Sequence, residues 1–201
     1  TGVGITLSKN QFQYANRKIK ELGLQNQIKV LYQDYRCLSG KFDKIVSIGM
    51  MEHVGKRFIP TFIQKVSDLL KTGGLALLHT IGKDTPSAGD PWTFSYIFPG
   101  AYIPTLHEIV KEMGKTDFSI LDVENLRLHY AKTLKKWAEN FEGNIEKIKK
   151  LFDEEFVRQW RLFLNSTAAG FKYGNSRLFQ ILVSKGLDNT LPVTRAHVYQ
   201  D

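Results

Sequence analysis

Short apolar runs alternate with helical stripes along this chain, and this alternation constrains the fold more than any other feature. Residues 42–48 form a nearly continuous apolar, β-branched run, which predicts a strand buried on both faces. An apolar stripe at helical spacing follows over residues 58–70 and stops at a Lys-Thr-Gly-Gly turn, after which residues 75–79 predict another buried strand. Because successive parallel strands need crossover connections, this order predicts an α/β fold with a parallel sheet covered on both sides.

The remaining segments repeat the same rhythm. Ser8 and Gln11 predict a capping box that opens a helix, and Gly23 supplies the left-handed residue that usually ends one. A second capping box, Thr105 with Glu108, predicts a shorter helix farther along the chain. Further strands are predicted over residues 3–7, 28–32, 118–123 and 178–183.

Two segments depart from this rhythm. Residues 80–104 contain glycines, prolines and aromatic side chains without a regular period, which is typical of an ordered loop that serves as a lid or pocket wall. Residues 133–171 carry large apolar and aromatic side chains at helical spacing, with one break near Gly143. This pattern predicts a helical insertion, at about residues 131–171.

Length and composition are those of a single packed domain. The chain has 201 residues, of which 42% are apolar, and we expect one domain over residues 1–186 and a tail over 187–201. No apolar run reaches the roughly 18 residues that a membrane-spanning helix needs. The single cysteine, Cys37, cannot form an internal disulfide. These features predict a cytoplasmic protein.

The formal net charge of +8 implies a modest attraction to anionic surfaces, with phospholipid headgroups and nucleic acid as the two candidates. The lysines lie in small clusters, at Lys135 and Lys136 and over residues 147–150, and form no arginine-rich stripe interleaved with aromatic side chains. Such clusters are typical of a solvated helix face. We therefore predict no nucleic-acid partner.

Glu52 and His79 are the first candidate site residues, because they follow two predicted strands at the end where ligands bind in open parallel sheets. A carboxylate and an imidazole in one crevice can orient a small polar ligand or move a proton. The alternative is structural: Glu52 caps the helix that follows it, and His79 makes a satisfied buried hydrogen bond. Residue spacing alone favours the structural alternative.

The other candidates also have structural alternatives. Tyr130 precedes the aromatic helix, where a phenol is more often part of a core. Asp34 ends a strand and is either an acceptor for a nucleoside amine or hydroxyl or a surface acid. Four aromatic side chains either line an acyl-chain tunnel or, as we favour, pack as a core: Trp92, Phe98, Trp137 and Trp160. The histidines show no ligand spacing with cysteines or acids, so we predict no metal site.

Several motifs occur in one order over almost the whole chain. They read GITLS at residues 4–8, QDYR at 33–36, FD through SIGM at 42–50, EHVG at 52–55, LLHTIG at 77–82, DPW at 90–92 and YIFPG at 96–100. Together these motifs resemble the catalytic domain of the cyclopropane-fatty-acid synthases and of the related mycolic-acid cyclopropane synthases. The resemblance implies a Rossmann-like class I methyltransferase sheet with a helical insertion.

The family implied by this resemblance transfers the methyl group of S-adenosylmethionine to a cis double bond of a phospholipid acyl chain. The resulting carbocation loses a proton to a bound bicarbonate ion and closes to a cyclopropane ring. By position, Glu52, His79 and Tyr130 resemble the residues that hold this ion, with the Ile48 carbonyl as a further contact. Thr167 stands where the family normally has a cysteine whose backbone contacts the ion, so the backbone contact is retained and the thiol is not.

The same resemblance implies a cofactor site near the start of the chain. Thr6, Leu7 and Gln11 would contact the ribose or methionine part of S-adenosylmethionine, and Asp34 and Tyr35 would flank the adenine. Family members precede the first residue of this sequence with a strand ending in aspartate, a glycine-rich turn and a helix. Because this sequence lacks that first strand and loop, we expect the isolated chain to bind the cofactor poorly.

Three functions are compatible with these observations. The first is a lipid-modifying cyclopropane synthase, whose partners would be phospholipid acyl chains and which would associate peripherally with the inner face of the membrane. The second is a related methyltransferase that makes branched lipids or methylates a small amine. The third is an inactive, truncated remnant. A homodimer is one oligomeric state that the resemblance allows.

Overall fold

The computed structural model describes residues 1–198. The chain divides into two compact units, Thr1–Lys41 and the residues from Phe42 onward. Both units combine strands with helices, so the predicted α/β class is confirmed. The sequence predicts one partial domain over residues 1–186, and those boundaries stay a prediction.

The first unit is a small strand-helix-strand element. It consists of β1 (Gly2–Thr6), α1 (Lys9–Glu21), β2 (Ile28–Tyr32) and a 3-10 turn over Tyr35–Cys37. β1 and β2 pair in parallel, with α1 as the crossover between them. Ser8 caps α1 by accepting from the Gln11 backbone N–H at 3.3 Å, whereas the Gln11 side chain accepts from the Thr6 hydroxyl. Only half of the predicted capping box therefore forms, while Gly23 follows the helix at φ 67° as expected.

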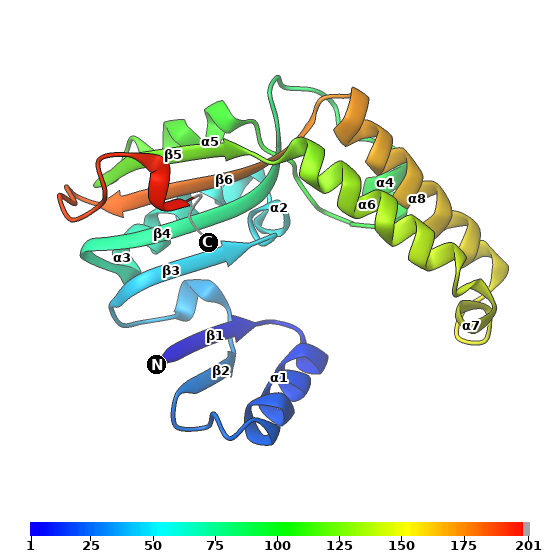
Figure 1. Ribbon diagram of the computed structural model, residues 1–201, viewed down its shortest axis with the longest axis horizontal. Coiled ribbons are helices and arrows are strands. Elements are labelled where there is room, and N and C mark those ends of the chain that lie inside the picture. The colour runs from blue at the N-terminus through cyan, green and yellow to red at the C-terminus, as the bar shows by residue number, and fades with distance from the viewer. Residues whose placement is uncertain (199–201) are drawn as a thin grey trace. The chain divides into compact units, whose positions relative to one another are not determined.

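The second unit carries a sheet and a helical insertion (Figure 1). Its elements are β3 (Phe42–Ile48), α2 (Met51–Val54), a 3-10 turn (Lys56–Phe58), α3 (Ile59–Leu69), β4 (Leu70–Lys83), α4 (Pro91–Tyr96), α5 (Leu106–Met113), β5 (Phe118–Asn125), α6 (Arg127–Glu142), α7 (Ile145–Lys149), α8 (Glu154–Tyr173), β6 (Ser176–Lys185) and a final 3-10 turn (Arg195–Val198). The strands follow the order β3-β4-β6-β5 across the sheet.

The sheet of the second unit is mixed, so the prediction of a wholly parallel sheet is wrong. β3 and β4 are parallel, but β6 runs antiparallel to both of its neighbours, β4 and β5. An apolar run predicts that a segment is a strand, but it carries no information about the direction in which the strand enters the sheet. Mixed sheets of this kind are common in α/β folds.

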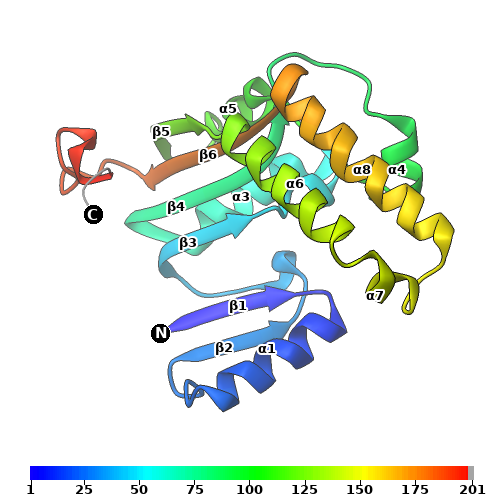
Figure 2. The same ribbon diagram turned by 45° about the vertical axis from the view of Figure 1, so that its right-hand side comes forward.

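Helices α3 and α5 lie on the same side of this sheet (Figures 1 and 2). Along β4 the alternate residues Ala76, Leu78 and Thr80 are fully buried, and the residues between them are partly exposed. On β3, Val46 and Ile48 are 62% and 69% exposed. The prediction that this strand is buried on both faces is therefore wrong. β3 is the edge strand of its sheet, and an apolar run does not reveal whether a helix covers each face.

The helical insertion is a hairpin of α6 and α8 that extends from one end of the sheet (Figure 2). The predicted break at Gly143 is a longer interruption that reaches Asp153 and contains α7. The buried core of the hairpin consists of Ala131, Leu134, Phe141, Val157, Leu164, Phe171 and Leu178. Because Leu178 lies on β6, this core joins the insertion to the sheet.

The segment over residues 80–104 has more regular structure than its composition predicts. β4 continues to Lys83, and α4 begins where the Asp90 side chain accepts from two backbone N–H groups. The segment is held at its far end, because the Tyr102 N–H donates to the Glu52 carbonyl at 2.9 Å. The capping box that follows it, Thr105 with Glu108, forms as predicted.

Candidate active site

A cavity of about 1010 Å³ lies within the second unit, where the sheet meets the helical insertion. Its walls come from the ends of β3 and β4, the start of β6, the facing sides of α6 and α8, and the segment over residues 83–103. The prediction that residues 80–104 form a pocket wall is confirmed. The cavity is large enough for a substantial ligand, and most of its lining is apolar or aromatic.

The five candidate catalytic residues line this one cavity. They are Ile48 at the end of β3, Glu52 on α2, His79 on β4, Tyr130 on α6 and Thr167 on α8. The fold thus brings together side chains from five elements spread over much of the chain. Their individual roles stay predictions.

Glu52 is the most unusual group in the cavity. Its side chain is 5% exposed, and its Oε1 accepts from the Ile81 backbone N–H at 2.5 Å. Its Oε2 is buried and has no hydrogen-bond partner among the described residues. The alternative that Glu52 caps the helix that follows it is wrong, because its hydrogen bond goes to β4 and neither α2 nor α3 has a side-chain cap. Buried carboxylate oxygens are rarely left unpaired, so Oε2 marks a place for a donor from a ligand.

His79 and Tyr130 each contact a neighbouring side chain, and each keeps one polar atom that can bond a ligand in the cavity: Nε2 of His79 and the hydroxyl of Tyr130. The Gln180 amide donates to His79 Nδ1 at 3.1 Å, which in the neutral ring leaves the hydrogen on Nε2. The Tyr130 ring packs edge to face on Phe171, with centroids 4.8 Å apart. Burial, and then the charge of Glu52, raise the pKa of Tyr130, so its phenol stays protonated and can donate a hydrogen bond.

The aromatic side chains give a second correction. The sequence favours a packed core for Trp92, Phe98, Trp137 and Trp160, but the last three of these line the cavity. Trp92 is not among the lining residues and packs near Tyr96. A period of aromatic residues along a helix identifies the face that turns inward. It does not show whether that face meets other side chains or a cavity.

Sequence reasoning missed several groups that shape the site. Among them are the Ile81 N–H, the Gln180 amide and the polar side chains of Lys83 and Ser176, which also line the cavity. Lys83 shares a face with His79 on β4, but the predicted strand ended at residue 79, so its position could not be predicted. The positions of Gln180 and Ser176 could not be predicted either, because they depend on the antiparallel register of β6.

The candidate cofactor residues belong to the first unit. Thr6 and Leu7 lie at the carboxyl end of β1 with Gln11 on α1, and Asp34 and Tyr35 follow the carboxyl end of the adjacent parallel strand β2. The side-chain and backbone hydrogen bonds from Arg36 lower the pKa of the Asp34 carboxyl. Asp34 is therefore a charged acceptor at neutral pH.

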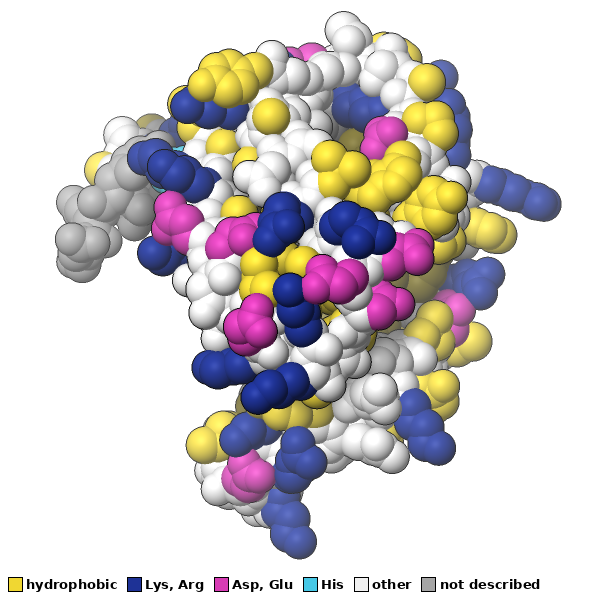
Figure 3. All heavy atoms as spheres, turned by 90° about the vertical axis from the view of Figure 1, so that its right-hand side faces the viewer, with side chains coloured by type: hydrophobic (Ala, Val, Ile, Leu, Met, Phe, Trp, Pro, Cys, Tyr) yellow, Lys and Arg dark blue, Asp and Glu magenta, His cyan; other side chains and the backbone are white. Residues whose placement is uncertain are grey.

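The clustered lysines of the insertion are exposed, and two of them pair with acids. Lys136 pairs with Glu139 at 3.0 Å, and Lys149 pairs with Glu154 at 2.7 Å. On the side of the molecule seen in Figure 3, basic and acidic side chains are interspersed. This pattern confirms the solvated helix face. The absence of a nucleic-acid partner stays a prediction.

No group of three or more His, Cys, Asp or Glu side chains among residues 1–198 is arranged to hold a metal ion. In the same part of the chain, no helix has the length and apolar character needed to cross a bilayer.

Comparison with known proteins identifies the family. The sequence profile described as "Mycolic acid cyclopropane synthetase" matches residues 1–181. The chain belongs to the mycolic acid cyclopropane synthetase family. The resemblance seen in the sequence motifs is therefore confirmed.

Curated relatives in this family are similar over nearly the whole chain. The "Probable fatty acid methyltransferase" of Pseudomonas putida is 37% identical over 208 residues, which cover 98% of this chain and 53% of that protein. The "Cyclopropane-fatty-acyl-phospholipid synthase" of Escherichia coli K12 is 37% identical over 194 residues, covering 96% of this chain and 50% of that protein. The chain thus spans about half the length of the curated relatives it matches.

A solved structure supports the same family fold. The mycolic acid cyclopropane synthase CmaA1, complexed with SAH and CTAB, has a TM-score of 0.85 and is 28% identical in sequence. The match covers 91% of this chain and 69% of CmaA1. The methyltransferase fold is therefore shown for this chain.

Proposed function

We propose that the protein to which this chain belongs transfers the methyl group of S-adenosylmethionine to the cis double bond of an unsaturated phospholipid acyl chain and forms a cyclopropane ring. The observation that carries this proposal is the unpaired, buried Glu52 Oε2 inside a large aromatic cavity, in a chain of the mycolic acid cyclopropane synthetase family. Its methyltransferase and cyclopropane synthase relatives support the reaction type.

The first unit fits the cofactor by its chemistry. In open α/β sheets, nucleotides bind beyond the carboxyl ends of parallel strands, which is where Thr6 and Asp34 lie. The Asp34 carboxylate can accept from an adenosyl group besides its bonds to Arg36, because an ionised carboxyl has about four lone-pair sites. Thr6, Leu7 and Gln11 would hold the ribose or methionine part, and Tyr35 would flank the base. When bound, S-adenosylmethionine supplies the electrophilic methyl group.

The polar end of the cavity fits a bicarbonate ion. Glu52 Oε2 needs a donor, and the hydroxyl of the ion provides one, while the Tyr130 phenol and His79 Nε2 can donate to its oxygens. The Ile48 carbonyl and the Thr167 backbone would complete the contacts. When bound, this ion supplies the base that accepts the proton.

The chain's own residues would protect the reacting carbons. A carbocation is quenched by water, so the site must exclude it, and aromatic faces attract a cation. Phe94, Phe98, Trp160 and Phe163 line the cavity and could meet both needs. Tyr130, kept protonated by its raised pKa, would stay a donor through the reaction.

The test uses the full-length protein with unsaturated phospholipid vesicles and S-adenosylmethionine labelled in its methyl group. We expect labelled cyclopropane acyl chains. We expect Glu52→Gln to slow their formation on the order of 100-fold, because it removes the carboxylate that holds the proposed base and so weakens general-base catalysis. Glu146→Gln, at a side chain 87% exposed on α7, serves as the matched control. An intact protein that labels no acyl chain, or a Glu52→Gln variant as fast as the control, would contradict the proposal.

A methyl-branched product is the second candidate, favoured by the name of the Pseudomonas putida relative, a probable fatty acid methyltransferase. Both products start from the same methyl transfer and differ in whether the ring closes. Mass and double-bond analysis of the labelled chains separates them. A small amine as acceptor fits the apolar lining of the cavity less well.

Peripheral association with the inner face of the membrane follows from a lipid substrate. The net charge of +8 supports attraction to anionic headgroups. Co-sedimentation with vesicles tests this location: we expect more protein to sediment with anionic than with zwitterionic vesicles. Sedimentation of the protein without vesicles tests whether it is a homodimer.

A further inference from the structure

The cavity wall has a second polar pair that the proposed reaction does not use. His79, Ile81 and Lys83 alternate along β4 and therefore share a face, and all three line the cavity. On the neighbouring strand β6, Leu178 pairs with Ile81 and Ser176 pairs with Lys83, and both line the cavity too. Lys83 and Ser176 thus form a polar pair two residues along the strand from Ile81, whose N–H binds Glu52.

The Lys83 ammonium lacks a carboxylate partner. Its Nζ donates to the Ser87 carbonyl at 3.2 Å, and among residues 1–198 no carboxylate oxygen lies within 4.0 Å of it. Two of its N–H groups therefore stay available to a ligand. Burial lowers the pKa of Lys83, as expected for an ammonium removed from water without a nearby negative charge.

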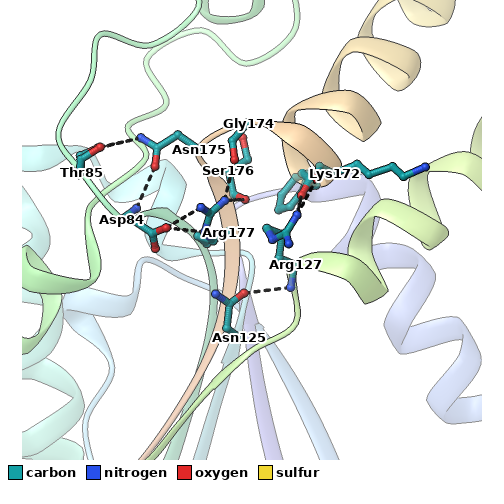
Figure 4. Close-up of polar contacts among 10 residues, drawn as sticks. Asp84, Thr85, Asn125, Arg127, Lys172, Gly174, Asn175, Ser176 and Arg177 are labelled. Carbon is teal, nitrogen blue, oxygen red and sulfur yellow. Dashed lines mark hydrogen bonds and ion pairs between the residues drawn. The ribbon is translucent and has the colours of Figure 1, made fainter.

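The acid next to Lys83 in the sequence, Asp84, is paired with Arg177 (Figure 4). Asp84 Oδ2 accepts from Arg177 at 2.7 Å and at 2.5 Å. Asn175 fixes the same turn, accepting from the Asp84 N–H and donating to the Thr85 carbonyl. Because Asp84 is already paired, it does not neutralise the lysine.

Ser176 adds a second donor at the same place. It lies opposite Lys83 in the antiparallel register, where side chains of paired residues are close neighbours. Within the described part of the chain, its hydroxyl forms no hydrogen bond. A cation and a free hydroxyl side by side in a cavity wall are suited to an anionic oxygen group.

We propose that Lys83 and Ser176 bind the anionic group of the acyl substrate. This inference rests on the proposed lipid function and adds what part of the lipid the cavity recognises. The shared chemistry is an anionic oxygen group on an acyl chain, either the phosphate ester of a phospholipid or the carboxylate of a free fatty acid.

Binding of single-chain probes tests this without any methyl transfer. Dodecyl phosphate, dodecanoate and dodecanol share one chain, and each is titrated below its aggregation limit into the full protein. Trp137 and Trp160 line the cavity, so tryptophan fluorescence reports occupancy. We compare the parent protein with Lys83→Met, which keeps an apolar stem, with Lys83→Arg, which keeps the charge, and with Lys147→Met on exposed α7 as control.

We expect the parent and the Lys147→Met control to bind dodecyl phosphate about tenfold more tightly than dodecanol, the value of one charged hydrogen bond. Lys83→Met should lose this preference while its affinity for dodecanol is unchanged, and Lys83→Arg should recover it. If dodecanoate also binds more tightly than dodecanol, the site accepts anionic groups in general. If only dodecyl phosphate does, the site recognises a phosphate ester.

Two results would overturn the inference. Equal affinity for dodecyl phosphate and dodecanol in the parent, or an unchanged preference in Lys83→Met, refutes the anion site and leaves the acyl cavity standing. If none of the three probes binds, the acyl cavity itself is wrong, and the proposed lipid function fails with it.

Discussion

Glu108 joins the cavity wall to the rest of the second unit, and its substitution by glutamine gives a quantitative test. The carboxylate on α5 accepts from the Tyr102 hydroxyl at 2.8 Å, from the Thr105 N–H at 2.8 Å and from Lys56 Nζ at 3.1 Å. The Tyr102 backbone in turn donates to the Glu52 carbonyl. The Glu108 network therefore fixes the segment that stands beside the candidate catalytic carboxylate.

The size of the effect follows from the pKa of Glu108. Burial opposes its ionisation, but the bonds from Thr105, Tyr102 and Lys56 outweigh burial and lower the pKa from 4.5 to about 2. At about 1.36 kcal/mol per pKa unit, this difference corresponds to about 3 kcal/mol of folding free energy. Because the side chain is 27% exposed, we reduce this for solvent screening and expect Glu108→Gln to lower the free energy of unfolding by about 2 kcal/mol at pH 7.

The pH dependence has a definite sign. A carboxyl whose pKa is lower in the folded state stabilises the fold fully above pH 4.5, and this contribution is lost as the pH falls toward 2. In urea unfolding followed by tryptophan fluorescence, the difference between the parent and Glu108→Gln should shrink at pH 3 to less than half of its value at pH 7. Glu146→Gln, at an 87% exposed side chain, should differ little from the parent at either pH. A difference for Glu108→Gln that is equal at pH 3 and pH 7 would refute the reasoning.

Two further substitutions test the packing within the sheet and the lining of the cavity. A Cβ at Gly82 would lie 2.8 Å from the Phe179 ring, so Gly82→Ala should lower the free energy of unfolding by about 1–3 kcal/mol. The control is Gly2→Ala, which should lower it less because no atom lies within 4 Å of the added Cβ. Equal urea midpoints for the two variants would contradict this prediction. Ala101 lines the cavity, so Ala101→Phe should weaken the binding of dodecanol with little change in the free energy of unfolding measured in urea. An unchanged affinity would show that the alkyl chain of the probe does not occupy this side of the cavity.

Local patterns made much of the fold predictable. The strand over Ile28–Tyr32 and the capping box at Thr105 depend on neighbouring residues alone, and the structure has both as predicted. Longer elements were less accurate at their ends. β4 begins at Leu70 and continues to Lys83, because hydrogen bonds to the strands on either side extend it beyond its apolar run.

The candidate site was predictable only in part. The family resemblance singled out Glu52, His79 and Tyr130, and the fold places all three on one cavity. Its other features depend on pairings between distant segments. The bond from Ile81 to Glu52 and the pairing of Ser176 with Lys83 each join residues far apart in the chain.

The sequence by itself determined the α/β class, the family and the residue types available for chemistry, because motifs, periodicity and caps are local properties of the chain. Only the tertiary structure decided that β6 is antiparallel and that three aromatic side chains line a cavity. It also decided that, among the described residues, Glu52 Oε2 has no hydrogen-bond donor and Lys83 has no carboxylate partner. The physical reason is that strand direction, cavity volume and hydrogen-bond satisfaction are set by the register between elements, which no single segment encodes.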